Sequence, residues 1–145
     1  MTKLNKFVEF NVVKFLQDSK RWESKKKHLQ EELDAITEIK GQSENSAGHS
    51  GKISDPVASV AAERMRLETQ IKRIELYEEA LAYGRSTLTD EQNAVLDAFF
   101  FKGGYISHNV DVLAYEFAVA TRSIYTMRRE VLDSLRRTIT DAYFN

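Results

Sequence analysis

Hydrogen-bonding side chains recur at helical spacing between Thr121 and Thr138, a segment that we predict to be one helix. At about 100° per residue, its apolar residues fall on one side, and arginine, serine, tyrosine and threonine fall opposite them or at the margins. Such side chains read the edges of base pairs in a DNA major groove. The apolar set is Ile124, Met127, Val131 and Leu135, and the candidate base-reading set is Arg122, Ser123, Tyr125, Thr126 and Arg129.

A second set of side chains is suited to contacts with DNA phosphates. Arg128 differs from the others because the same angular count places it near the core-facing side, where we expect an internal ion pair or a phosphate contact at the edge. The alternative for the whole arginine cluster is a solvated helix face with ion pairs such as Arg129 with Asp133. The candidate phosphate contacts are Lys102, Thr121, Arg128, Arg136 and Arg137.

Two shorter helices precede this segment. "LTDEQNAVLDAFF" predicts a helix with Thr89 as its N-cap, followed by acidic residues in the first turn, and "KGGY" ends it. The next helix is expected to begin with Asn109 as its N-cap. A short helix, a tight turn and an arginine-bearing helix predict a helix-turn-helix in residues 85–145, in which Ala114 and Ala118 let the helices approach closely.

The upstream half is predicted to contain two long helices. Residues 1–40 form an N-terminal helical segment with helix from Phe7 to Lys40, residues 41–54 form a flexible Gly/Ser linker, and residues 55–84 form a coiled-coil-like helix. Asp55 is its expected N-cap with Pro56 at the first position, and Gly84 is expected to end it in the left-handed conformation.

An apolar stripe on the second long helix leaves two possibilities open. Residues spaced by seven favour pairing with another helix, either within the chain as a hairpin or between chains as a coiled coil that makes a homo-oligomer. The candidate oligomerisation residues are Val60, Leu67, Ile74 and Leu81. The predicted fold is therefore all-α, with long N-terminal helices in a hairpin or coiled coil before the helix-turn-helix.

Composition excludes several classes of function. The chain has 145 residues, a formal charge of −1 and no cysteine, so disulfides and thiolate sites are absent. Its three histidines lack partners at metal-ligand spacing, and we find no phosphate-binding loop or nucleophile motif. We therefore expect no metal, no cofactor and no enzymatic activity. The apolar N-terminal stretch is interrupted by charges, which favours a cytoplasmic protein without a membrane partner.

The last 50 or so residues resemble region 4 of bacterial sigma-70-type factors. Leu88-Thr89 and Glu91 match that family's "LT-x-E" opening, and Leu113-Ala114 and Glu116-Phe117 fall where it has a short scaffold helix. Ala118 stands where the turn commonly has glycine, and Ala120 where a serine cap is usual. Each departure would cost on the order of 1 kcal/mol if the backbone there is left-handed or uncapped, unless Thr121 supplies the cap.

Most of the chain is also similar to phage late-gene transcriptional regulators of the RinA and ArpU type, on its helix, linker, "DP" helix start and C-terminal helix-turn-helix. This resemblance implies a regulator that binds double-stranded DNA and activates late genes through bacterial RNA polymerase. Two alternatives stay open. A phage small terminase subunit would recognise packaging-site DNA as a larger ring, and a helical interaction module would bind polymerase or another protein through its coil.

Overall fold

The computed structural model describes residues 10–45 and 56–144, and every regular element in these ranges is helical. The all-α prediction is confirmed. The chain forms two compact units. One is a helical hairpin of residues 21–77. The other combines residues 10–20 with residues 78–144, so its two parts are far apart in the sequence.

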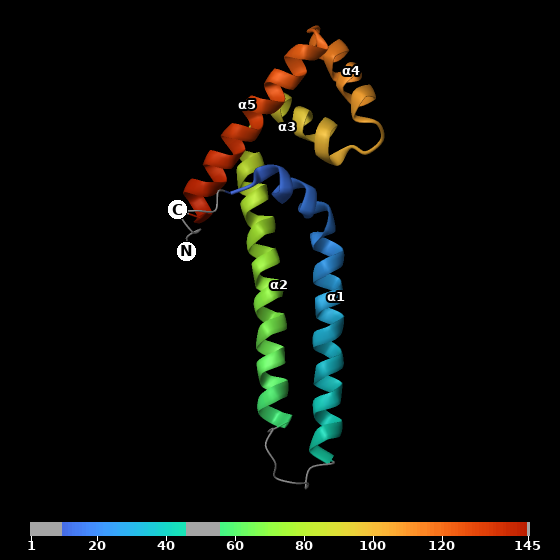
Figure 1. Ribbon diagram of the computed structural model, residues 1–145, viewed down its shortest axis with the longest axis vertical. Coiled ribbons are helices and arrows are strands. Elements are labelled where there is room, and N and C mark those ends of the chain that lie inside the picture. Colours follow the sequence, from blue (N-terminus) through green and yellow to red (C-terminus); the bar gives the residue numbers. More distant parts are fainter. Residues whose placement is uncertain (1–9, 46–55, 145) are drawn as a thin grey trace. The chain divides into compact units, whose positions relative to one another are not determined.

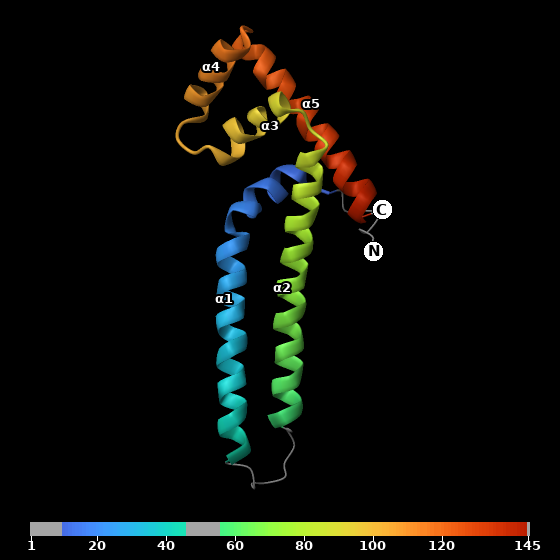
Figure 2. The same cartoon turned by 180° about the vertical axis from the view of Figure 1, so that it is seen from behind.

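The hairpin unit consists of most of α1 (Val12–Asn45) and α2 (Pro56–Ser86), which run antiparallel and side by side (Figures 1 and 2). Trp22 and Leu29 on α1 and Leu67 and Ile74 on α2 are buried, and the rings of Trp22 and Tyr77 lie 5.9 Å apart. Of the two possibilities for the long helices, the structure shows the hairpin.

The stripe predicted for oligomerisation is largely used inside the chain. Leu67 and Ile74 are buried, and Val60 and Leu81 are half-buried. Burying apolar surface against α1 provides the stabilisation that the stripe would otherwise gain from a second chain. Its two central members are therefore covered in the hairpin.

The limits of the long helices differ from the prediction at three points. Helix α1 begins at Val12, where the Oδ1 of Asn11 accepts a hydrogen bond from the Lys14 N–H at 3.1 Å, and it continues to Asn45. Residues 41–45, which the sequence places in the linker, are thus helical, because glycine and serine lower helix propensity without preventing a helix. The predicted linker residues 46–54 and the predicted cap Asp55 lie outside the described residues.

Helix α2 begins at Pro56 as predicted, but the prediction for Gly84 is wrong. Gly84 lies inside α2 and is not among the residues with positive φ. It is buried, and a Cβ at this position would come within 2.6 Å of Leu135 Cδ1. Glycine is required here by close packing of α5 on α2, not by backbone conformation.

Besides the adjoining parts of α1 and α2, the second unit contains α3 (Asp90–Leu96), the π-helical turn η1 (Asp97–Phe101), α4 (Ile106–Phe117) and the longer α5 (Thr121–Ile139). Helix α5 continues into the π-helical turn η2 (Thr140–Phe144). Helix α3 contacts α5, and α4 contacts both α5 and η1. Figures 1 and 2 show α4 and α5 meeting at a turn, with α3 between their open ends. Their shared core contains Val95, Ala98, Val110, Leu113, Ala114 and Ile124.

The start of α3 follows the prediction closely. Thr89 is the N-cap, and its hydroxyl accepts a hydrogen bond from the Gln92 N–H, while the Gln92 side chain accepts one from the Thr89 N–H. This reciprocal pair is a capping box, which satisfies two backbone donors at the helix end. Gly103 and Gly104 end the segment with positive φ, also as predicted in outline.

The predicted cap of α4 is wrong. The helix begins at Ile106 with Tyr105 as its N-cap, and Asn109 lies within the first turn, buried. The Asn109 amide donates to the carbonyl oxygens of Ala98 at 3.1 Å and Gly103 at 2.9 Å. Asn109 therefore satisfies carbonyl groups near the end of the preceding helix and ties α4 to η1.

Residues near the start of α1 belong to this second unit. Val12, Phe15 and Leu16 are buried, and the ring of Phe10 lies 5.2 Å from that of Phe144. The sequence predicts a C-terminal domain that begins at residue 85. In the structure, the compact unit that contains α3, α4 and α5 extends back to residue 78 and also includes residues 10–20.

Candidate nucleic-acid interface

The turn between α4 and α5 is three residues long and depends on Ala118. This residue has φ 56° and ψ 45°, the left-handed conformation that glycine adopts more readily. The Val119 N–H donates to the Ala114 carbonyl at 3.0 Å, which closes the end of α4. Ala114 is buried between the helices as predicted, but Ala118 is exposed and acts through its backbone, not through close helix packing.

Helix α5 begins without a side-chain cap. Ala120 is the N-cap residue in extended conformation, and it makes no side-chain capping bond. Thr121 is the first helical residue, so the prediction that it takes over the cap is wrong. A threonine already inside the helix cannot adopt the extended backbone that directs a cap oxygen at the N2 and N3 amides.

The structure brings the five candidate base-reading side chains together on the first half of α5. On the opposite side, Ile124 and Val131 are buried and Met127 is half-buried, as predicted. The Thr126 hydroxyl donates to the Arg122 carbonyl at 3.2 Å, a local bond that rotation of the hydroxyl can exchange for a bond to a ligand. The exposed set is Arg122, Ser123, Tyr125, Thr126 and Arg129.

Tyr125 and Arg128 both contact Phe99. The Tyr125 and Phe99 rings meet edge to face, with centroids 5.4 Å apart and planes at 69°. The Arg128 guanidinium lies over Phe99 at 5.1 Å and over Phe100 at 5.5 Å from the ring centroids. Within the described residues, these cation–π contacts replace the internal ion pair expected for Arg128.

Asp133 pairs with the two arginines of the last turns of α5. Its carboxylate accepts from Arg136 at 2.7 Å and from Arg137 at 2.8 Å, rather than pairing with Arg129. The hydrogen bond from Arg136, with the nearby charge of Arg137, lowers the pKa of Asp133. A negative charge on this part of the helix partly neutralises two of the candidate phosphate contacts.

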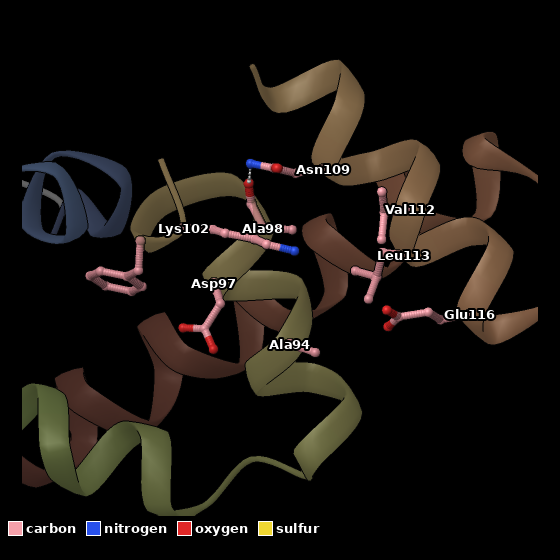
Figure 3. A pocket seen from close by; sticks show the side chains of 9 residues that line it. Ala94, Asp97, Ala98, Lys102, Asn109, Val112, Leu113 and Glu116 are labelled. Atoms are coloured by element: carbon pink, nitrogen blue, oxygen red, sulfur yellow. Dashed lines mark hydrogen bonds between the residues drawn. The ribbon is translucent and has the colours of Figure 1, made fainter. Parts of the chain in front are cut away.

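Lys102 lies outside α5, after η1 and before α4, and it is exposed. Lys102 lines a cavity of about 390 Å³ between η1 and α4 (Figure 3). The figure shows Asn109 bonded to Ala98 at one side of this cavity. Its lining is Ala94, Asp97, Ala98, Phe101, Lys102, Asn109, Val112, Leu113 and Glu116.

Two residues that bear on the interface were not identified from the sequence. For the segment that contains Phe99 the sequence predicts only a helix, and it indicates Asp133 only as a partner for Arg129. The run of three phenylalanines at 99–101 could have indicated the role of Phe99, because three consecutive large rings cannot all face one core in a regular α-helix. The π-helical turn distributes them over different neighbours.

A metal site and a membrane-spanning helix have no counterpart in residues 10–45 and 56–144. In these ranges no three histidine, cysteine or carboxylate side chains are placed to hold a metal ion. None of the helices described there is long and apolar enough to span a bilayer. No protein-family model matches the sequence, and neither a curated protein nor a solved structure shows significant similarity to it.

Proposed function

We propose that this protein is a sequence-specific regulator of transcription that binds double-stranded DNA with the exposed face of α5. The observation that carries the proposal is the division of α5 into two sides. Arg122, Thr126 and Arg129 face solvent, while Ile124 and Val131 anchor the helix in the core. A helix that enters a major groove needs this division, with polar side chains outside and apolar anchoring behind.

The path of the chain into α5 supports the same proposal. Helix α4, a three-residue turn and α5 have the order of a helix-turn-helix, in which the first helix crosses the DNA backbone and the second reads bases. Arg136, Arg137 and Thr121 would contact phosphates on either side of the base-reading residues. The resemblance to sigma region 4 and to late-gene regulators is the reason to assign the task to transcription, with RNA polymerase as the further partner.

A homo-oligomer is part of the proposal because two linked recognition helices bind two half-sites with a large gain in affinity. Leu67 and Ile74 are covered within the hairpin, so a dimer that keeps the hairpin must use other surface. Light scattering after size exclusion, with and without DNA, measures the stoichiometry. A ring of many copies would favour the packaging function over regulation.

The test is selection of bound duplexes from a randomised library, followed by affinity measurements on a selected and an unrelated duplex of equal length. Arg122→Ala or Arg129→Ala should reduce the preference for the selected duplex, since a bidentate arginine–guanine pair contributes roughly 1–3 kcal/mol of discrimination. Arg137→Ala should weaken both duplexes about equally. Arg73→Ala on the exposed surface of the hairpin is the charge-matched control and should change little.

Two results would contradict this proposal in whole or in part. If the unchanged protein shows no salt-sensitive binding to any duplex, the arginines of α5 form a solvated face and a protein-interaction role is favoured. If Arg122→Ala weakens every duplex equally, Arg122 is a phosphate contact and is not a base-reading residue.

A further inference from the structure

We infer that Arg128 is a positioning residue, which acts on DNA binding through Phe99 and Tyr125, and that the Tyr125 hydroxyl is the group that contacts the DNA backbone at this margin of α5. The inference rests on the proposed function. It changes the role expected for two side chains: Arg128 moves from phosphate contact to support, and Tyr125 moves from base reading to backbone contact.

The surroundings of Arg128 are those of a supporting group. Its side chain is half-buried, and its guanidinium lies against two rings, those of Phe99 and Phe100. Reaching a phosphate would require it to leave both rings, and the aromatic surface beneath it would become exposed. The exposed arginines of the same helix reach a phosphate without such a loss.

The surroundings of Tyr125 are those of a group held ready for contact. It precedes Arg128 by three residues, so both lie on the side of α5 that faces Phe99. The edge-to-face contact with Phe99 restricts the Tyr125 ring, yet 48% of the residue remains exposed. A tyrosine whose ring is already packed loses little conformational freedom when its hydroxyl donates to an acceptor such as a phosphate oxygen.

The π-helical turn η1 carries Phe99, which contacts both Arg128 and Tyr125. The same turn carries Phe101, which provides a matched control. The Lys102 N–H donates to the Asp97 carbonyl across five residues at 2.6 Å. Phe101, two residues after Phe99, lies instead under the guanidinium of Arg85 at 4.9 Å. Arg85 also binds Asp97 at 2.8 Å. Phe99 and Phe101 therefore belong to the same turn but make cation–π contacts with different arginines, Arg128 and Arg85.

The experiment measures binding of full-length variants to a labelled duplex selected from the randomised library and to an unrelated duplex, at salt concentrations between about 50 and 200 mM. The variants are Arg128→Met, Phe99→Leu, Tyr125→Phe and the pair Arg128→Met with Tyr125→Phe. Phe101→Leu is the structural control, and Arg137→Ala is the control for a direct phosphate contact. Thermal unfolding identifies a temperature at which each variant is folded.

We expect Arg128→Met, Phe99→Leu and Tyr125→Phe each to weaken both duplexes by about tenfold, the loss typical of one hydrogen bond to a charged group. The slope of log affinity against log salt should not change for any of them, because no cation leaves a phosphate. Arg137→Ala should reduce that slope by roughly 0.9. The paired variant should bind no more weakly than its weaker single variant, and Phe101→Leu should bind like the unchanged protein.

Several results would overturn the inference while leaving the proposed function intact. A slope for Arg128→Met reduced as in Arg137→Ala would make Arg128 a direct phosphate contact. Equal losses for Phe99→Leu and Phe101→Leu would make the role of Phe99 merely structural. Unchanged binding by Tyr125→Phe, which keeps the ring and the fold, would remove the hydroxyl from the interface. Absence of salt-sensitive DNA binding by the unchanged protein would overturn both proposals.

Discussion

The backbone of Gly84 on α2 lies directly against the side chain of Leu135 on α5. A Cβ at position 84 would be 2.6 Å from Leu135 Cδ1 and 3.1 Å from Ile139 Cγ1, closer than side chains normally approach. This contact fixes the C-terminal half of α5, in which Leu135 and Ile139 are fully buried. The first half of the same helix carries the proposed DNA-binding face.

Gly84→Ala is expected to destabilise the protein by about 1–3 kcal/mol, because the added methyl group displaces well-packed side chains. Thermal or denaturant unfolding measures the loss. In a Leu135→Ala background, the same substitution should cost clearly less, since the space that the methyl group needs is then open. An equal cost in both backgrounds would show that the two residues do not oppose each other.

Ala118→Gly is expected to stabilise the protein by up to about 1 kcal/mol. At φ 56° an alanine Cβ is strained, whereas glycine is not, and this gain exceeds the added freedom of glycine in the unfolded chain. The melting temperature should rise. Ala82→Gly, on the exposed surface of α2, is the control and should lower it. If both substitutions lower the melting temperature, Ala118 is not left-handed in solution.

Asp133→Asn is expected to strengthen binding to all duplexes and to leave sequence preference unchanged. The substitution removes a carboxylate from the proposed DNA-binding helix and releases Arg137 from its ion pair, so that it can contact a phosphate. Fluorescence anisotropy with selected and unrelated duplexes measures the effect. Glu68→Gln, which removes an exposed charge from the hairpin unit, is the control and should have a smaller effect.

Acidification provides an independent check of the Asp133 contacts. The arginines lower the pKa of the Asp133 carboxyl in the folded protein. The pairing is therefore complete above the pKa that this carboxyl has in the unfolded chain, and it is lost as the pH falls through its lower pKa in the folded protein. Binding of the unchanged protein should approach that of Asp133→Asn across this window. A constant ratio between the two proteins down to low pH would contradict the pairing.

Leu16→Ala is expected to destabilise the unit that carries α5, by about 2–5 kcal/mol, because Leu16 is fully buried and belongs to that unit. Denaturant unfolding followed by the intrinsic fluorescence of its tyrosines measures the loss. The neighbouring Gln17→Ala is exposed and should have little effect. If Leu16→Ala changes only the signal of Trp22 in the hairpin, residues 10–20 do not support the second unit.

Local signals were sufficient for several elements of the fold. Thr89 is an N-cap followed by Asp90 and Glu91 in the first turn, and the sequence predicts this helix start correctly because its hydrogen bonds all lie within four residues. The two sides of α5 follow from helical periodicity in the same way. Pro56 at the first position of α2 is another local effect, since proline needs no backbone donor there.

Contacts between distant residues could not be predicted. Asn109 has the residue type of an N-cap, but its partners Ala98 and Gly103 are set by the packing of α4 on η1. Gly84 has the residue type of a helix end, but α5 determines its role. The stripe of Leu67 and Ile74 predicts a partner helix without specifying which one, because burial in a hairpin and in a dimer needs the same spacing.

In the candidate site, too, periodicity predicts exposure but not contacts with residues of other helices. The exposure of Arg122 and Arg129 follows from periodicity, whereas the placement of Arg128 on Phe99 depends on a π-helical turn that shifts the register of the preceding helix. The pairing of Asp133 with Arg136 and Arg137, and not with Arg129, is a choice among several neighbours at allowed spacings.

The interrupted order of the second unit bears on how the chain folds as it leaves the ribosome. Residues 21–77 contain everything that the hairpin needs, so it can form early from neighbouring segments. Val12, Phe15 and Leu16 are synthesised before the hairpin but find their permanent surroundings only after α5 has been synthesised. A nascent chain that has not yet reached α5 would therefore carry a finished hairpin and an uncovered apolar segment at residues 12–16.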